Sequence, residues 1–212
     1  VYDATKDKIK DNDKPTLRQY LEAPEGVEPK DRSWSELFYE NYNENMNKVV
    51  LVTGGAGYIG SNIINKLARC DCKIVCVDNF SNSYNFAINR IIEKYSNVVL
   101  EQGDILDNTF MEMLFQKYNF DCVIHMAGKK YVKDSFYETE EYYKNNIIAT
   151  QNLLDIMTKH KVNKLIFASS ISVYGVCSVP PYKEEYEFNP QSPYAQMKAD
   201  GEKIIKEWCG QN

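Results

Sequence analysis

Two side chains near the carboxyl end of the chain have the types and spacing of a proton-transfer site. Tyr194 and Lys198 are four residues apart, so in a helix they face the same side, one turn apart. A free phenol has a pKa of about 10 and is a poor base at neutral pH. A neighbouring ammonium group and the positive ring of an oxidised nicotinamide would favour the phenolate, so the pair predicts a tyrosine base. Tyr-x-x-x-Lys occurs by chance in many helices, so the prediction depends on the rest of the chain.

A glycine-rich stretch follows the first predicted strand. The segment Thr53-Gly-Gly-Ala-Gly-Tyr-Ile-Gly60 joins a β-branched run directly to a helix. Glycines there permit a tight turn and a close approach of a pyrophosphate, and the helix N-terminus adds amides and a positive dipole end. Asp78 ends the second predicted strand, where a carboxylate accepts hydrogen bonds from a ribose diol and repels a 2′-phosphate. The sequence therefore predicts NAD rather than NADP as the cofactor.

The elements that must position these groups are short β-branched runs alternating with longer amphipathic segments, which is typical of parallel strands joined by helices. We expect strands at 49–52, 73–77, 98–102, 121–125 and 164–168. We expect helices at about 58–68, 84–95, 108–118, 135–160 and from Pro193, which Ser192 can cap. On the fourth helix, Tyr143, Ile147, Leu154 and Met157 share an apolar side. The pattern predicts an α/β fold, a three-layer doubly wound Rossmann-type parallel sheet whose carboxyl edge holds Ser169 and Ser170.

The chain divides into an extension and one domain. Residues 1–45 are rich in proline and charge, which predicts a largely disordered N-terminal extension. Its one short helix would begin at Ser33, which forms a capping-box pattern with Glu36. Residues 46–212 form the predicted NAD-binding domain. Sheets of this kind continue into a further strand, so we expect the domain to be incomplete at its C-terminus and truncated before a substrate domain.

Composition excludes several classes of protein. Lys and Arg number 25 against 30 Asp and Glu, a net charge of −5, and the basic residues are scattered, so nucleic acid is not an expected partner. No apolar run approaches the roughly 20 residues that cross a bilayer, and no secretory leader is visible. Three of the six cysteines lie between Cys70 and Cys76, and there are two histidines and no Cys-x-x-Cys pair. Reduced thiols, a cytoplasmic location and no metal site are expected.

The order of these motifs resembles the extended short-chain dehydrogenase/reductase family, and further stretches are similar to the UDP-glucose 4-epimerases within it. These stretches are Asp78–Ser83, Gly103–Ile105, His125–Lys130, Glu141–Asn146, Ser169–Gly175 and Pro190–Tyr194. The resemblance covers the chain from Val49 to about Lys206. It implies interconversion of UDP-glucose and UDP-galactose by a tightly bound NAD that takes a hydride from sugar C4 and returns it.

The resemblance also implies the role of each site residue. Tyr194 would take the proton of the sugar 4-hydroxyl, Ser170 would hydrogen-bond that hydroxyl, and Lys198 would hold the cofactor ribose. Gly54, Gly57, Tyr58 and Ile59 would line the pyrophosphate, Asp78 and Asn79 the ribose, Asp104 and Ile105 the adenine, with Ala127, Gly128, Lys130, Asn145, Ser169, Tyr194 and Lys198 at the remaining contacts. The implied partners are a UDP-sugar and a second copy of the chain, in a homodimer formed by the helices at 135–160 and 193–209.

Two alternatives stay open. The first is a sibling nucleotide-sugar dehydratase or decarboxylase, although dehydratases carry an acidic pair where this chain has Ile171 and Ser172. The second is an inactive NAD-binding fragment, because the family's uridine-nucleotide site lies beyond the matched region. For that reason we expect the chain alone to bind NAD weakly and to turn over poorly.

The chain also departs from the family at Ala168, where relatives have serine, and at Lys129, where they have an apolar residue.

Overall fold

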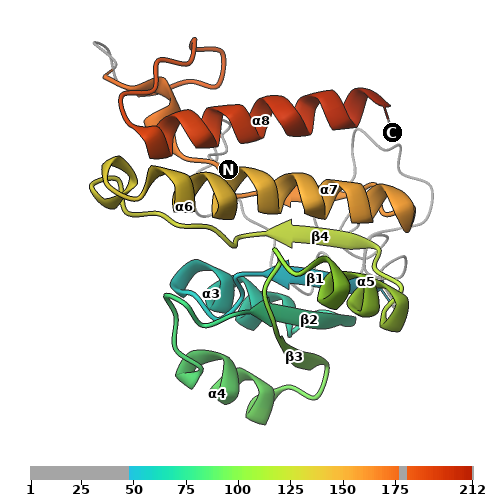
Figure 1. Ribbon diagram of the computed structural model, residues 1–212. Coiled ribbons are helices and arrows are strands. Elements are labelled where there is room, and N and C mark those ends of the chain that lie inside the picture. The colour runs from blue at the N-terminus through green and yellow to red at the C-terminus, as the bar shows by residue number, and fades with distance from the viewer. Residues whose placement is uncertain (1–47, 177–180, 212) are drawn as a thin grey trace, which may run out of the picture. The chain divides into compact units, whose positions relative to one another are not determined.

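The computed structural model describes residues 48–176 and 181–211, which form a doubly wound parallel sheet (Figure 1). Its strands are β1 (Lys48–Thr53), β2 (Cys72–Asp78), β3 (Val98–Gln102), β4 (Cys122–His125) and β5 (Leu165–Phe167), in the order β3-β2-β1-β4-β5. All four pairings are parallel. The predicted α/β Rossmann-type fold is confirmed. The helix predicted at Ser33 lies outside the described residues.

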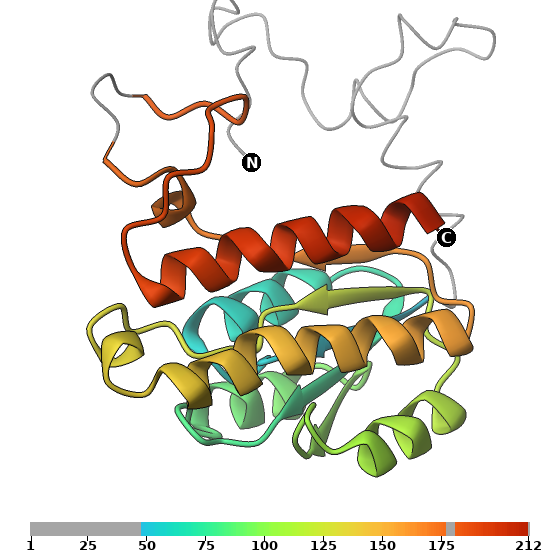
Figure 2. The same cartoon turned by 45° about the horizontal axis from the view of Figure 1, so that its top comes forward.

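Helices cover both faces of the sheet. They include α3 (Tyr58–Leu67), α4 (Phe86–Lys94), α5 (Asn108–Lys117), α7 (Ala149–Lys159) and α8 (Pro193–Gln211). On one face, Leu51, Val75 and Val123 pack against α5 and α7. On the other face, Val52, Ile74 and Ile124 pack against α3 and α4. Adjacent residues of one strand thus enter opposite cores, as side-chain alternation requires. α8 lies beside α7 (Figures 1 and 2).

The segment predicted as one helix over 135–160 is divided. It contains a 3-10 turn, η3 (Asp134–Phe136), then α6 (Thr139–Tyr143), a π-helical turn, η4 (Lys144–Ile148), and α7. In a π-helical turn the backbone hydrogen bonds join residues five apart instead of four. The residue that faces the core before the turn is therefore shifted by one position in the sequence. Tyr142, five residues before the buried Ile147, is therefore 1% exposed, whereas Tyr143 is 47% exposed. The prediction that Tyr143 shares the apolar side with Ile147 is wrong for this reason.

The strand ends assemble at one edge. Thr53 pairs with Val77 and with His125, and His125 pairs with Phe167, so the loops that follow these strands converge. The last helix starts as predicted, because the Ala195 amide donates to Ser192 Oγ at 3.1 Å.

Two further observations concern the outer edge of the sheet and the helices. Among the described strands, none pairs with the outer side of β5, where Ile166 is 57% exposed. Within residues 48–176 and 181–211, no helix is long and apolar enough to cross a membrane.

Candidate functional site

The carboxyl edge of the sheet encloses a cavity of about 740 Å³. The loops after all five strands, together with α3 and α8, contribute to its lining. The predicted site residues that line it are Gly54, Gly57, Tyr58, Ile59, Asp78, Asn79, Asp104, Ile105, Ala127, Gly128, Lys130, Asn145, Ser169, Tyr194 and Lys198. Ser170 is the predicted site residue that does not line the cavity. The structure thus brings together groups that are as far apart in sequence as Gly54 and Lys198.

The glycine turn forms the floor of the cavity. Gly54 has a φ of +65°, and a Cβ there would lie 2.6 Å from the Ala127 nitrogen, so only glycine fits. Gly57 precedes α3, and no side chain caps the start of that helix. The first amides of a helix have no intrahelical partner, and they carry the positive end of its dipole. This end of α3 suits a phosphate group.

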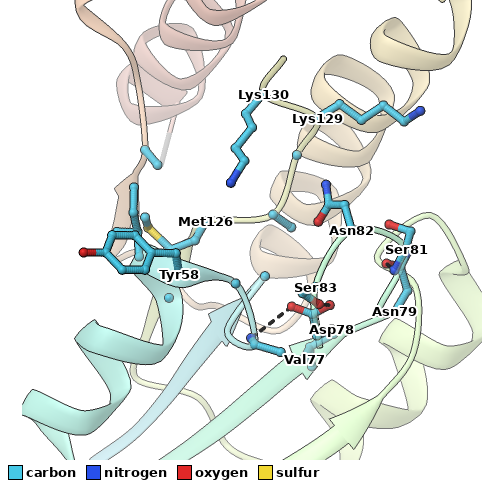
Figure 3. Close-up of a pocket in the computed structure, with 18 of the residues that line it drawn as sticks. Tyr58, Val77, Asp78, Asn79, Ser81, Asn82, Ser83, Met126, Lys129 and Lys130 are labelled. Atoms are coloured by element: carbon cyan, nitrogen blue, oxygen red, sulfur yellow. Dashed lines mark hydrogen bonds between the residues drawn. The ribbon is translucent and has the colours of Figure 1, made fainter. Parts of the chain in front are cut away.

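Asp78 connects the glycine turn to the loop after β2. Its carboxylate accepts hydrogen bonds from the Ala56 amide at 3.0 Å, the Phe80 amide at 2.9 Å and Ser83 Oγ at 2.8 Å. Figure 3 shows Asp78 beside Ser83. Phe80 holds a φ of +57°, which is uncommon for a bulky residue and is concentrated at functional sites. A carboxylate offers about four acceptor positions. The remaining one can accept from a ribose hydroxyl in the cavity.

Two neighbouring loops form the next part of the wall. Asn79 Nδ2 donates to Asp104 Oδ2 at 2.9 Å, which ties the end of β2 to the end of β3. Lys130 reaches into the cavity on the side of Tyr58, whereas Lys129 points away (Figure 3). The Lys129 ammonium pairs with Glu138 at 3.0 Å and with Glu141. Lys130 is thus the cation better placed to meet a phosphate.

The tyrosine and lysine of the first turns of α8 are both buried at the cavity. Lys198 Nζ donates to the Ala168 carbonyl at 2.8 Å and lies 4.7 Å from the centre of the Phe167 ring. Burial lowers the pKa of Lys198 to about 8. The side chain therefore remains mostly protonated at neutral pH. Tyr194 lies one turn before it, as the spacing predicts.

Ser170 and Ser169 have partners that the sequence analysis did not identify. Ser170 Oγ lies 2.8 Å from Ser172 Oγ and accepts from the Ser172 amide at 3.2 Å, at the start of the turn η5 (Ile171–Tyr174). The Ser170 side chain therefore contacts the turn η5 and not the cavity. The Ser169 hydroxyl donates to the carboxylate of Glu202. The spacing Tyr194, Lys198, Glu202, one residue per turn of α8, is the signal that would have found Glu202.

Asn146 is another residue that the motifs did not assign. Its side chain accepts from the Lys129 amide at 2.8 Å and donates to the Lys129 carbonyl at 3.0 Å. It is buried, whereas the preceding Asn145 lines the cavity. The two adjacent asparagines of η4 thus have different environments.

Together these features define a dinucleotide-binding domain of the extended short-chain dehydrogenase type. They are a doubly wound sheet, a glycine turn after β1, an acidic residue at the end of β2, and a tyrosine and a lysine one turn apart at the same cavity. The chain belongs to the family described as GDP-mannose 4,6 dehydratase, whose model matches residues 51–211. This confirms that the chain is a member of the nucleotide-sugar epimerase and dehydratase group.

Individual relatives are UDP-glucose 4-epimerases, as the motifs predicted. UDP-glucose 4-epimerase 2 of Oryza sativa subsp. japonica is 38% identical over 164 residues, which are 76% of this chain and 40% of that protein. The UDP-glucose 4-epimerase of Bacillus subtilis (strain 168) is 38% identical over 159 residues, 74% of this chain and 47% of that protein. The chain spans less than half the length of these curated relatives.

The solved structures that resemble this chain are also structures of UDP-sugar 4-epimerases. The UDP-glucose 4-epimerase of Bifidobacterium longum, in complex with NAD+ and UDP, superposes with a TM-score of 0.73 at 38% identity, over 76% of this chain and 48% of that chain. The UDP-Glc/GlcNAc 4-epimerase of Campylobacter jejuni has a TM-score of 0.75 at 30% identity, over 78% of this chain and 50% of that chain.

Proposed function

We propose that this chain supplies the NAD-binding and catalytic part of a nucleotide-sugar 4-epimerase that interconverts UDP-glucose and UDP-galactose. The observation that carries the proposal is that Tyr194 and Lys198 line the same cavity as the glycine turn and Asp78. Residues that would bind a dinucleotide and residues that would move a proton thus share one cavity. The similar structures of Bifidobacterium longum and Brucella ovis contain NAD, and NAD is the cofactor.

The residues of this cavity fit the cofactor part by part. The bare glycine turn and the start of α3 suit the pyrophosphate, with Lys130 as a counter-charge. The free acceptor position of Asp78 suits a ribose hydroxyl, and a 2′-phosphate there would meet its negative charge. When bound, NAD would supply a reversible acceptor for the hydride of sugar C4.

The protein's own part in the reaction is proton transfer and orientation. Tyr194 takes the proton of the sugar 4-hydroxyl and later returns it. Lys198, mostly protonated at neutral pH, stabilises the phenolate form of Tyr194, which is the form that accepts the proton. Ser170 does not line the cavity, and its Oγ contacts Ser172 Oγ instead. We therefore expect binding of the substrate to rotate the Ser170 side chain.

The full-length protein is proposed to be a cytoplasmic homodimer that acts in galactose metabolism. The helices expected to form the dimer interface, α7 and α8, lie side by side (Figure 2). Light scattering coupled to size-exclusion chromatography measures the mass directly, and a monomer at micromolar concentration would contradict the dimer.

The experiment that tests the activity is a coupled assay with UDP-galactose, no added NAD and detection of UDP-glucose. Wild-type turnover that is lost in Tyr194→Phe supports the proposal. A dehydrated 4-keto product would instead support the sibling dehydratase. Absence of turnover, with NAD released when the purified protein is denatured, would mean that this chain is a cofactor-binding domain without epimerase activity.

A further inference from the structure

We propose that a buried chain of hydrogen bonds through Asn146, Thr150, His125 and Thr53 fixes the loop at 126–130 against the cofactor, with His125 as its central positioning residue. The role rests on the proposed function, because the cofactor that this loop would contact is the NAD proposed there. The consequence is that cofactor affinity depends on residues that do not touch the cofactor.

His125 ends β4 and is 1% exposed. Its Nδ1 lies 2.7 Å from Thr53 Oγ1, and its Nε2 lies 3.0 Å from Thr150 Oγ1. A buried imidazole is tolerated when both nitrogens have partners. The two threonines satisfy both, one from β1 and one from α7, so the ring joins the sheet to the helix layer.

The chain of bonds runs in one direction only. The Thr150 hydroxyl donates to the Asn146 carbonyl at 2.8 Å, so its oxygen accepts from His125 Nε2–H. A neutral ring that donates at Nε2 accepts at Nδ1, here from the Thr53 hydroxyl. Thr53 Oγ1 in turn accepts from the Ala127 amide at 3.3 Å. Burial, together with the nearby charge of Lys198, lowers the pKa of His125 to about 3, which keeps the ring neutral.

Both ends of this chain hold the same loop. The Ala127 amide is one end, and the Asn146 side chain brackets the amide and carbonyl of Lys129 at the other. Gly128 lies between them, where a Cβ would be 2.8 Å from Asn146 Oδ1. The loop is thus held by hydrogen bonds at Ala127 and Lys129, on either side of Gly128. Lys130, which follows Lys129, enters the cavity.

The test compares the same substitution at two positions of α7. Thr150→Val removes the acceptor of His125 Nε2–H. Thr158→Val removes an exposed threonine hydroxyl two turns away, which donates to the Leu154 carbonyl and accepts from Trp208 Nε1. We expect Thr150→Val to weaken NADH binding about tenfold in a fluorescence titration, because a buried donor left unpaired disturbs the loop. Thr158→Val should leave the affinity unchanged, and Thr150→Ser, which keeps the hydroxyl, should restore it.

The outcomes separate this proposal from the proposed function. Unchanged affinity in Thr150→Val, or equal weakening in Thr158→Val, would overturn the positioning role. A second measurement needs no cofactor. NMR correlation of the imidazole nitrogens and protons gives the tautomer of His125 in His160→Gln, where it is the remaining histidine. A neutral ring protonated at Nε2 is the expected result, and an Nδ1–H or doubly protonated ring would overturn the chain. A wild type that binds no NADH would contradict the proposed function alone.

Discussion

Acidification to about pH 5 should lower the free energy of unfolding by about 2 kcal/mol through His125 alone. The pKa of His125 is about 3 in the folded chain, against the ordinary 6.5. Between these values the unfolded chain binds a proton that the folded chain excludes. The stabilisation is complete above pH 6.5 and is lost as the pH falls towards 3. Each pH unit in this window costs about 1.4 kcal/mol, which gives the stated loss about 1.5 units below 6.5.

The assay is urea unfolding followed by circular dichroism at about pH 7.5 and about pH 5. The sequence has two histidines, so the measurement is made in His160→Gln, and the matched control adds His125→Gln. The control should lose the histidine-linked fall in stability. An equal free energy of unfolding at both pH values in His160→Gln would show that His125 accepts protons in the folded state. The argument from its burial would then be wrong.

Three further predictions concern the glycine turn, the helix α8 and its cap. Gly54→Ala should destabilise the chain by at least about 2 kcal/mol in urea unfolding, because the residue has positive φ and no room for a Cβ. Lys198→Met should lower the epimerisation rate at least about a hundredfold while leaving stability unchanged or higher, since it removes a buried charge. Ser192→Ala should cost about 1 kcal/mol of stability, measured by the same unfolding, with no change in NADH affinity.

The part of the site that follows from local pattern could be predicted from the sequence. The glycine turn after β1 and Asp78 at the end of β2 are each specified by a few consecutive residues. Parallel pairing then brings the strand ends together, as the alignment of Thr53 with Val77 shows. Tyr194 and Lys198 needed only the helical period and a cap at Ser192.

The rest depends on contacts between distant residues. Thr53 and His125 are 72 positions apart, and no periodic pattern marks a buried hydrogen bond of that kind. The π turn is equally hidden, because the sequence around Ile147 suits an ordinary helix, and tertiary packing selects Tyr142 instead of Tyr143. The orientation of Ser170 depends on Ser172 two residues on, a contact that motif order does not encode.

The outer side of β5 has a practical consequence for producing this chain. An edge strand presents amides and carbonyls to any other strand that approaches, and an apolar side chain there favours association. Ile166 is such a side chain. Because no other strand among the described residues pairs with this side of β5, purified material should self-associate as its concentration rises. A lysine in place of Ile166 should improve yield and shelf life, because its charge disfavours strand pairing between molecules and lies outside the cofactor cavity.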